Sequence, residues 1–162
     1  DELRLPGVAS MRGPLSCLSE ARFGIVWGVM GAAQACYDAA LRYSLERRQF
    51  DTLIGGFQLT QQKLVDMMVS IQRGSLVSLH LGRRKDQGTL TSDQISFGKL
   101  DNVRQAREVA RTARSILGGN GITLEYAPIR HMANLETVYT YEGTHDVHTL
   151  VVGQALTGLN AF

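Results

Sequence analysis

Long hydrophobic runs, an excess of one charge sign and cysteine are all scarce in this sequence of 162 residues. The most hydrophobic run, residues 25–36, is too short to span a bilayer and is diluted by alanine and glycine, and no signal-peptide pattern is present. We therefore predict no membrane insertion. The 17 basic and 15 acidic residues leave a net charge of +2, and no basic run suggests a nucleic-acid surface. We expect no nucleic-acid partner.

Disulfide and metal-ligand patterns are equally sparse. Cys17 and Cys36 lie far apart in the sequence, and two cysteines do not make a disulfide framework. We expect reduced thiols in an intracellular protein. His145 and His148 share one helical turn with Asp146, but no third ligand set with convincing spacing accompanies them. The sequence therefore predicts no metal site.

Helical periodicity dominates what is present. Apolar residues recur every three or four positions, and no stretch shows sustained alternation with a period of two. The pattern predicts helices over residues 19–47, 59–87, 92–117, 128–135 and 144–157. Because short connections favour antiparallel neighbours, we predict an all-α fold, an antiparallel up-and-down helical bundle.

The start of the chain reads differently from the rest. Residues 3–14 hold two prolines and two glycines, which indicates a loop or strand. We expect residues 1–14 to be the remnant of a preceding domain or linker and residues 15–162 to form the bundle domain. Since the chain starts at Asp1 rather than at methionine, we also expect it to be cut from a longer polypeptide.

Two cations stand where the local pattern disfavours them. Lys99 interrupts the apolar stripe of the third predicted helix, between Ile95 and Val103. Arg22 lies near the start of the first predicted helix, where a cation opposes the helix dipole. The position of Arg22 suggests a partner elsewhere in the fold.

Glu142 is the best candidate for a catalytic base in this sequence. It lies in a tight turn before the last predicted helix, where Gly143 permits backbone angles closed to other residues and Thr144 is a good N-cap. A carboxylate held in such a turn and shielded from water suits proton abstraction near neutral pH. The alternative is a solvated glutamate beside a helix start, where the dipole favours negative charge.

Two further clusters have both a structural and a functional interpretation. Arg47 and Phe50 close the first predicted helix, and a guanidinium there either complements the helix dipole or binds phosphate oxygens. Residues 118–121, Gly-Gly-Asn-Gly, either stop a helix or let a ligand approach backbone N–H groups. They lack the G-x-G-x-x-G spacing after a strand, so they are not a Rossmann signature.

In combination, these clusters resemble the C-terminal helical domain of the acyl-CoA dehydrogenase family. The order and spacing of the matching elements agree with the family from residue 15 onward, and the glutaryl-CoA dehydrogenase subgroup is the most similar. The matching elements are residues 43–50 (Tyr-Ser-Leu-Glu-Arg-Arg-Gln-Phe), Gln58, residues 116–121 (Ile-Leu-Gly-Gly-Asn-Gly) and residues 141–144 (Tyr-Glu-Gly-Thr). Those typical of the subgroup are residues 22–28, 81–83, 85–87, 129–131 and 142–146.

The resemblance implies a flavoenzyme that binds FAD and an acyl-CoA thioester. Glu142 would remove the α-proton while a hydride passes from the β-carbon to the flavin. In the glutaryl-CoA subgroup the product then loses CO2 to give crotonyl-CoA, and electrons leave through electron-transfer flavoprotein. The family also implies a homotetramer, located in the cytoplasm of a bacterium or in the mitochondrial matrix of a eukaryote.

The resemblance also assigns residues to sites. Arg47, Phe50 and Gln58 are expected to contact the FAD of a neighbouring subunit, and Thr144 is expected to contact the flavin. The remaining cofactor residues implied are Ser115, Ile116, Leu117, Gly118, Gly119 and Phe162. Tyr141 and Gly143 are expected to flank the thioester. The implied substrate-lining segment consists of Leu15, Ser16, Cys17, Leu18, Ser19, Glu20, Ala21 and Arg22.

Two positions depart from the family pattern. Ser115 stands where many relatives have glutamine, and Asp51 replaces a glycine, so the loop is expected to take a different path. The N-terminal and most of the β-domain of the family are absent from this sequence, so we expect the isolated domain to be inactive. Two alternatives remain: a dehydrogenase for another short or branched acyl-CoA, and a non-catalytic helical oligomerisation module.

Overall fold

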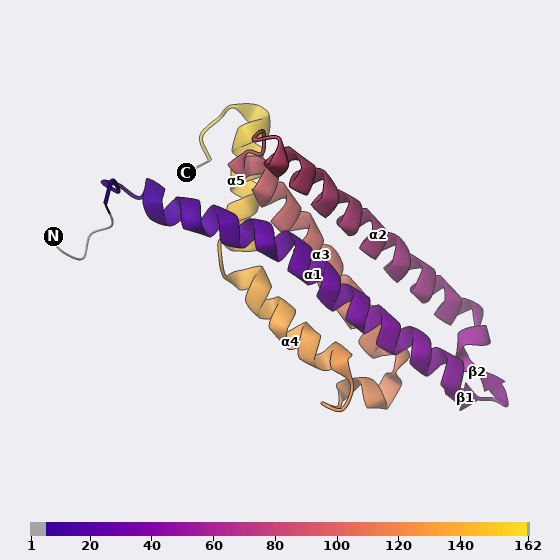
Figure 1. Cartoon of the computed structure of the whole chain (residues 1–162). Helices are drawn as coiled ribbons and strands as arrows, with labels where there is room; N and C mark the ends of the chain where they lie inside the picture. The colour runs from indigo at the N-terminus through magenta and orange to yellow at the C-terminus, as the bar shows by residue number, and fades with distance from the viewer. Residues whose placement is uncertain (1–5, 162) are drawn as a thin grey trace.

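The computed structural model describes residues 6–161, and within that range the chain is almost entirely helical (Figure 1). This confirms the all-α prediction. The helices are α1 (Arg12–Glu46), α2 (Gln58–Asp86), α3 (Ser92–Ile116), α4 (Ala127–Thr140) and α5 (His145–Thr157). Two short 3-10 helices, η1 (Ile54–Gly56) and η2 (Gly118–Ile122), and two two-residue strands, β1 (Arg48–Gln49) and β2 (Thr52–Leu53), occupy the connections.

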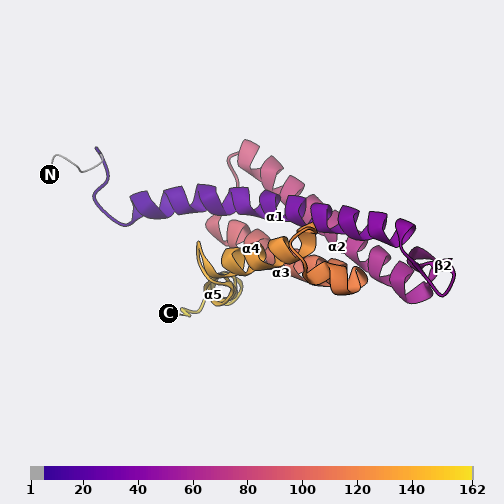
Figure 2. The same cartoon turned by 90° about the horizontal axis from the view of Figure 1, so that it is seen from below.

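Helices α1 to α4 run alternately in opposite directions, and α5 lies beside the first turns of α3 (Figures 1 and 2). Helix α3 is the centre of the bundle because it packs against each of the other four helices. Its inner stripe is rich in alanine, and Ala106, Ala110 and Ala113 are fully buried against Ala33 and Ala40 of α1. Such small side chains let the helix axes approach closely.

A buried polar cluster joins α1, α2 and α3. Asn102 Nδ2 donates to the carbonyl oxygens of Val26 (2.9 Å) and Gly74 (3.1 Å), and Ser78 Oγ donates to the same two oxygens. At Gly74 a Cβ atom would lie 2.2 Å from the Met30 sulfur and 3.1 Å from Asn102 Oδ1, so a larger residue would displace these side chains. The bonds fix the register of the three helices where they pack together.

The first helix begins earlier than the sequence indicated. We expected residues 3–14 to be loop or strand, but α1 starts at Arg12 and includes Gly13 and Pro14. Pro14 is tolerated because the N–H groups of the first helical turn have no intrahelical partner. The first turns of α1 project beyond the other helices (Figure 2). The proposed domain boundary after residue 14 therefore falls inside a helix.

Helix α4 is longer than predicted and α5 is close to the prediction. We expected α4 to end near Leu135, yet it continues to Thr140 although Thr137 and Val138 are weak helix formers. Packing of Val138 and Tyr139 against the core supplies the missing stability. Thr144 caps α5 by accepting a hydrogen bond from the Val147 N–H (3.2 Å), as predicted.

The α1–α2 connection forms a small antiparallel hairpin in which Arg48 pairs with Leu53 and Gln49 with Thr52. Phe50 and Asp51 form its tip with φ of 52° and 60°. Two-residue hairpin loops favour positive φ at both positions because that twist matches the strands. Asp51 thus adopts the left-handed conformation that glycine favours.

Two further findings bear on the sequence predictions. The thiols of Cys17 and Cys36 are both free, Cys17 exposed and Cys36 buried. Burial raises the pKa of the Cys36 thiol to about 12. Across the described part of the chain, no helix combines the length and the hydrophobicity that crossing a membrane requires.

Candidate active site

The turn between α4 and α5, residues 141–144, presents Glu142. Glu142 itself has φ of 57° and Gly143 has φ of 89°, so two successive residues adopt left-handed backbone conformations. For a residue with a Cβ atom this conformation costs about 1–2 kcal/mol, and surrounding contacts must hold it in place. The carboxylate is half-buried, and its Oε2 atom is buried without a hydrogen-bond partner among the described residues. The hydrogen-bonding capacity of this oxygen is therefore unused within the domain.

Three consecutive carbonyl oxygens of this turn point at cationic or N–H-bearing side chains from other helices. Lys99 Nζ of α3 donates to the Gly143 oxygen (2.6 Å) and to the Tyr141 oxygen. Arg22 Nε of α1 donates to the Glu142 oxygen (2.7 Å). His148 Nε2 of α5 lies 3.2 Å from that same oxygen. Side chains from α1, α3 and α5 therefore hold the turn.

Burial and neighbouring charges lower the pKa values of Lys99 and His148, two of the groups that hold the turn. Burial lowers the pKa of Lys99 to about 8; Arg22 acts in the same direction, and the Glu142 carboxylate opposes it. Burial, reinforced by Lys99 and Arg22, lowers the pKa of His148 to about 4. His148 is therefore neutral at pH 7. Since a carbonyl oxygen can only accept, we assign the imidazole proton to Nε2.

A largely apolar groove of about 450 Å³ lies beside this turn, between α1 and α4. Tyr141 contributes to its wall, so the groove is adjacent to the Glu142 turn. Ala21, from the expected substrate-lining segment, also lines it. The other lining residues are Gly24, Ile25, Gly28, Val29, Ala32, His131, Asn134, Leu135 and Val138.

The expected substrate-lining segment and the expected cofactor residues are placed differently. Residues 15–21 form early turns of α1 and are exposed or half-buried, with Glu20 paired to Lys85. Arg22 is the member of the segment that contacts the Glu142 turn. The segment thus leads along α1 towards Glu142.

Apart from Thr144 and Phe162, the expected cofactor residues belong to the end of α1, the hairpin, the start of α2 and the α3–η2 junction, near the opposite end of α4 (Figure 1). Since α4 has 14 residues, that end lies about 20 Å from Glu142. Arg47 and Gln58 are exposed there, and the Phe50 ring is 91% exposed. The glycine turn is held to α1 by a bond from Asn120 Nδ2 to Tyr43 Oη (3.1 Å).

Within residues 115–119 the side chains and the backbone face different surroundings. Ile116 and Leu117 are buried, whereas Gly118 and Gly119 are exposed. Ser115 Oγ accepts a bond from Lys63 Nζ (3.1 Å). Any ligand at this turn would meet backbone atoms of the glycines rather than the buried side chains. Thr144 lies at the other end of α4, beside Glu142, and Phe162 lies outside the described residues.

A family model described as the C-terminal domain of acyl-CoA dehydrogenase matches residues 11–157. The chain belongs to the acyl-CoA dehydrogenase family. The match covers all five helices, which confirms the resemblance drawn from the sequence motifs.

Solved structures of relatives have nearly the same fold as this acyl-CoA dehydrogenase domain. A glutaryl-CoA dehydrogenase from Mycobacterium smegmatis is 60% identical with a TM-score of 0.96, covering 98% of this chain and 41% of that chain. A second structure, a glutaryl-CoA dehydrogenase from the same organism in complex with FADH2, is 51% identical with a TM-score of 0.95. It covers 97% of this chain and 41% of that chain.

A curated relative extends the comparison to another organism. A glutaryl-CoA dehydrogenase from Desulfococcus multivorans is 32% identical over 136 residues, which is 83% of this chain and 35% of that protein. The chain therefore spans between a third and a half of the length of these relatives.

The sequence did not indicate that Lys99 and His148 hold the Glu142 turn of this acyl-CoA dehydrogenase domain. Lys99 was recognised as out of place in an apolar stripe, but nothing local indicated that it binds carbonyls 42 and 44 residues away. His148 was considered with His145 as a metal ligand pair. The ring of His145 instead stacks on Tyr139 (4.7 Å between centroids), and His148 bonds the turn.

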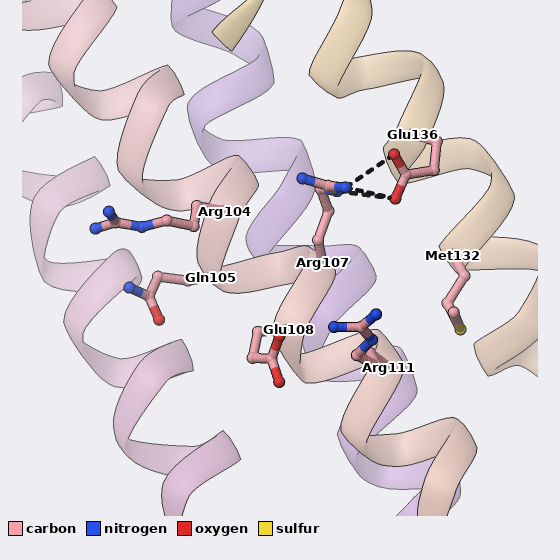
Figure 3. Close-up of a pocket in the computed structure, with 7 residues that line it drawn as sticks. All are labelled: Arg104, Gln105, Arg107, Glu108, Arg111, Met132 and Glu136. Atoms are coloured by element: carbon pink, nitrogen blue, oxygen red, sulfur yellow. Dashed lines mark hydrogen bonds and ion pairs between the residues drawn. The ribbon is translucent and has the colours of Figure 1, made fainter. Parts of the chain in front are cut away.

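A second cavity, of about 430 Å³, lies between α3 and α4 and is shown in Figure 3. Arg107 reaches across it to α4, where Nε and Nη2 donate to the two oxygens of Glu136, each at 2.9 Å. Arg104 pairs with Asp101 (2.6 Å). Most of the charge in this cavity is therefore neutralised within the domain, and none of the expected site residues lines it.

Among residues 6–161, no group of three or more His, Cys, Asp or Glu side chains is arranged to hold a metal ion. The titratable groups around Glu142 are a lysine, an arginine and a neutral histidine, and all three bond main-chain oxygens of the turn, which leaves the Glu142 carboxylate unpaired within the described part of the chain. The chemistry that this arrangement supports is proton transfer by Glu142.

Proposed function

We propose that this domain supplies the catalytic base and part of the FAD and substrate sites of a glutaryl-CoA dehydrogenase. The observation that carries the proposal is the Glu142 turn, with a buried carboxylate oxygen free of protein partners and a backbone held by three helices. The 60% identity to a glutaryl-CoA dehydrogenase supports the same reading.

The proposed chemistry begins with a proton at the α-carbon of the thioester. Polarisation of the thioester carbonyl makes the α-proton acidic, and exclusion of water strengthens that polarisation. Glu142 accepts the proton on its carboxylate. The hydride leaving the β-carbon would pass to FAD, which would supply the redox chemistry when bound. Tyr141 and Gly143 flank the base, and the largely apolar groove beside Tyr141 offers a surface for the acyl chain.

Glutaryl-CoA adds a decarboxylation step. Once the α- and β-carbons are joined by a double bond, the carboxylate next to the γ-carbon leaves as CO2, and the electron pair it leaves behind is delocalised towards the thioester. One proton must then be added at the γ-carbon to give crotonyl-CoA. Glu142, protonated in the first step, is the acid that this turn offers for that transfer.

The residues at the far end of α4 fit the anionic part of FAD. Arg47 offers a guanidinium, Gln58 an amide, and Gly118 and Gly119 exposed backbone, which together suit a diphosphate. These residues lie about 20 Å from Glu142 along α4, and in this proposal they contact the FAD of a neighbouring subunit. Phe50 at the exposed hairpin tip and Thr144 beside the base complete the contacts that we propose.

The same proposal includes a homotetramer and electron-transfer flavoprotein as the electron acceptor. Exposed apolar side chains along α2 favour burial against other copies of the chain. They are Leu59, Val65, Val69, Leu76 and Leu79, which are between 41% and 74% exposed. Sedimentation of the full-length enzyme should give a tetramer, and a clean monomer would contradict this part. We place the enzyme in the cytoplasm if its source is bacterial and in the mitochondrial matrix if eukaryotic.

The deciding experiment is anaerobic absorbance of the full-length flavoprotein mixed with glutaryl-CoA, with released CO2 trapped. Bleaching of the flavin with one CO2 released per turnover is expected. Bleaching by other short or branched acyl-CoAs but not by glutaryl-CoA would support an acyl-CoA dehydrogenase but refute glutaryl-CoA as its substrate. Absence of flavin and of bleaching with every thioester would favour a non-catalytic helical module.

The role of Glu142 has its own test. Glu142→Gln in the full-length enzyme removes the proton acceptor while keeping the size and shape of the side chain. Flavin reduction should fall by at least about 10³-fold, with FAD content unchanged. Normal turnover in this variant would refute the base assignment.

A further inference from the structure

We propose that Lys99 is a positioning residue that holds Glu142 in its left-handed conformation, so that the carboxylate faces the α-carbon of the thioester. The inference rests on the proposed function, because it concerns the geometry of the proposed base. It is carried by the contacts of the Lys99 ammonium with the carbonyl oxygens on either side of Glu142.

One bond from Lys99 and one from Arg22 fix the two peptide groups that adjoin the Glu142 Cα atom. The Tyr141 oxygen belongs to the peptide that precedes the Glu142 Cα atom, and Lys99 holds that peptide. The Glu142 oxygen belongs to the peptide that follows, and Arg22 holds it at 2.7 Å. Because both adjoining peptide planes are fixed, the rotations φ and ψ of Glu142 are fixed as well. The direction of its side chain follows from them.

Stability of the bundle does not explain a lysine at this position. Lys99 is 2% exposed, and its ammonium bonds carbonyl oxygens rather than a carboxylate. Burying a cation without a paired anion is costly, and the neighbouring positions of the α3 stripe carry apolar residues. A methionine would fill the same space without that cost, but it would leave the Tyr141 and Gly143 carbonyl oxygens without the Lys99 donor. The ammonium therefore stabilises the turn around Glu142 rather than the apolar core.

Lys99 also lies close to the proposed base. The Glu142 carboxylate acts to raise the pKa of Lys99, against the lowering by burial and Arg22. The Lys99 ammonium also lies 5.7 Å from the centre of the Tyr141 ring, on the wall of the apolar groove. The three groups that hold the turn are Lys99, Arg22 and His148, and all of them point at main-chain oxygens. The Glu142 side chain is left free to meet the substrate.

The test uses the full-length holoenzyme with Lys99→Met. The probe is an acyl-CoA with sulfur in place of the β-carbon and deuterium at the α-carbon, so that no hydride can leave. Glu142 removes the deuteron, solvent exchanges it, and a proton returns to the same carbon. Mass spectrometry then measures wash-out of deuterium, which reports the base separately from flavin reduction.

Asn102→Ala is the matched control. Asn102 lies three residues further along α3, is fully buried, and likewise donates to two main-chain oxygens, but those belong to Val26 and Gly74 in the core. We expect Lys99→Met to slow wash-out and flavin reduction by about 10–100-fold, with FAD content and acyl-CoA affinity within about threefold of wild type. Asn102→Ala should lower the thermal midpoint with both rates within about threefold of wild type.

Several outcomes would overturn the proposal. Wash-out by Lys99→Met within threefold of wild type would do so, and so would equal slowing in Asn102→Ala, which indicates a general loss of packing. If Lys99→Met does not retain FAD, Lys99→Leu, which likewise has no donor, is used, and wild-type wash-out by that variant overturns it equally. Wild-type enzyme that neither bleaches nor exchanges the α-deuteron refutes the proposed function itself, a result distinct from the preceding ones.

Discussion

Replacement of Gly143 by alanine tests whether the turn beside Glu142 is built as the structure indicates. Gly143 has φ of 89°, and a Cβ atom at this position would lie 2.9 Å from His148 Nε2 and 3.1 Å from its Cε1 atom. His148 is 2% exposed and bonds the Glu142 carbonyl, so its ring has little room to move. Gly143→Ala should therefore combine backbone strain with overpacking.

The two costs can be separated with a second glycine of the same domain. Gly158 ends α5 with φ of 71° and has open space around the position of a Cβ atom. Gly158→Ala should cost only the left-handed conformation, about 1–2 kcal/mol. Gly143→Ala should cost that amount and a further 1–3 kcal/mol, roughly, for the clash with His148.

The measurement is the urea midpoint of the full-length protein at pH 7 and a fixed FAD concentration, because ligand binding shifts apparent stability. Gly143→Ala should unfold at lower urea than Gly158→Ala. Amide exchange in the first turn of α5 should also increase in Gly143→Ala alone. Equal midpoints for the two variants would refute the close contact between Gly143 and His148.

Two further predictions concern pH and the hairpin. The pKa of His148 is lowered from 6.5 to about 4, so below pH 6.5 the unfolded chain takes up a proton that the folded chain does not. Stability is therefore present above pH 6.5 and is lost as the pH falls towards 4, by up to about 1.4 kcal/mol per pH unit. Urea midpoints at pH 7 and 5 should show a smaller pH-dependent loss for His148→Gln than for wild type; the same loss in both would contradict the assignment. Asp51→Gly should stabilise the protein by about 1 kcal/mol, because Asp51 has φ of 60°, and an unchanged or lower urea midpoint would count against that conformation.

Local sequence patterns predicted much of the fold. The apolar period of α2 and α3 predicted both helices to within a few residues, and Thr144 and Gly158 marked the two ends of α5. Predictions failed where local preference and packing disagree. Pro14 indicated a loop but is compatible with a first helical turn, and Thr137 and Val138 weakened a helix that contact with the core restores.

The candidate site likewise combines features that the local sequence predicts with contacts that depend on packing. The all-α fold, the family and Glu142 as the proposed base could be inferred from the sequence, because helix period, caps and the Tyr-Glu-Gly-Thr turn are short-range features. That Lys99, Arg22 and His148 hold this turn is visible only in the packed structure. Arg22 and Glu142 are 120 residues apart, and their contact depends on how α1 packs beside the α4–α5 connection. Helix period specifies which side of a helix is buried, but the particular atoms that a buried cation meets are set by the packing of several helices together.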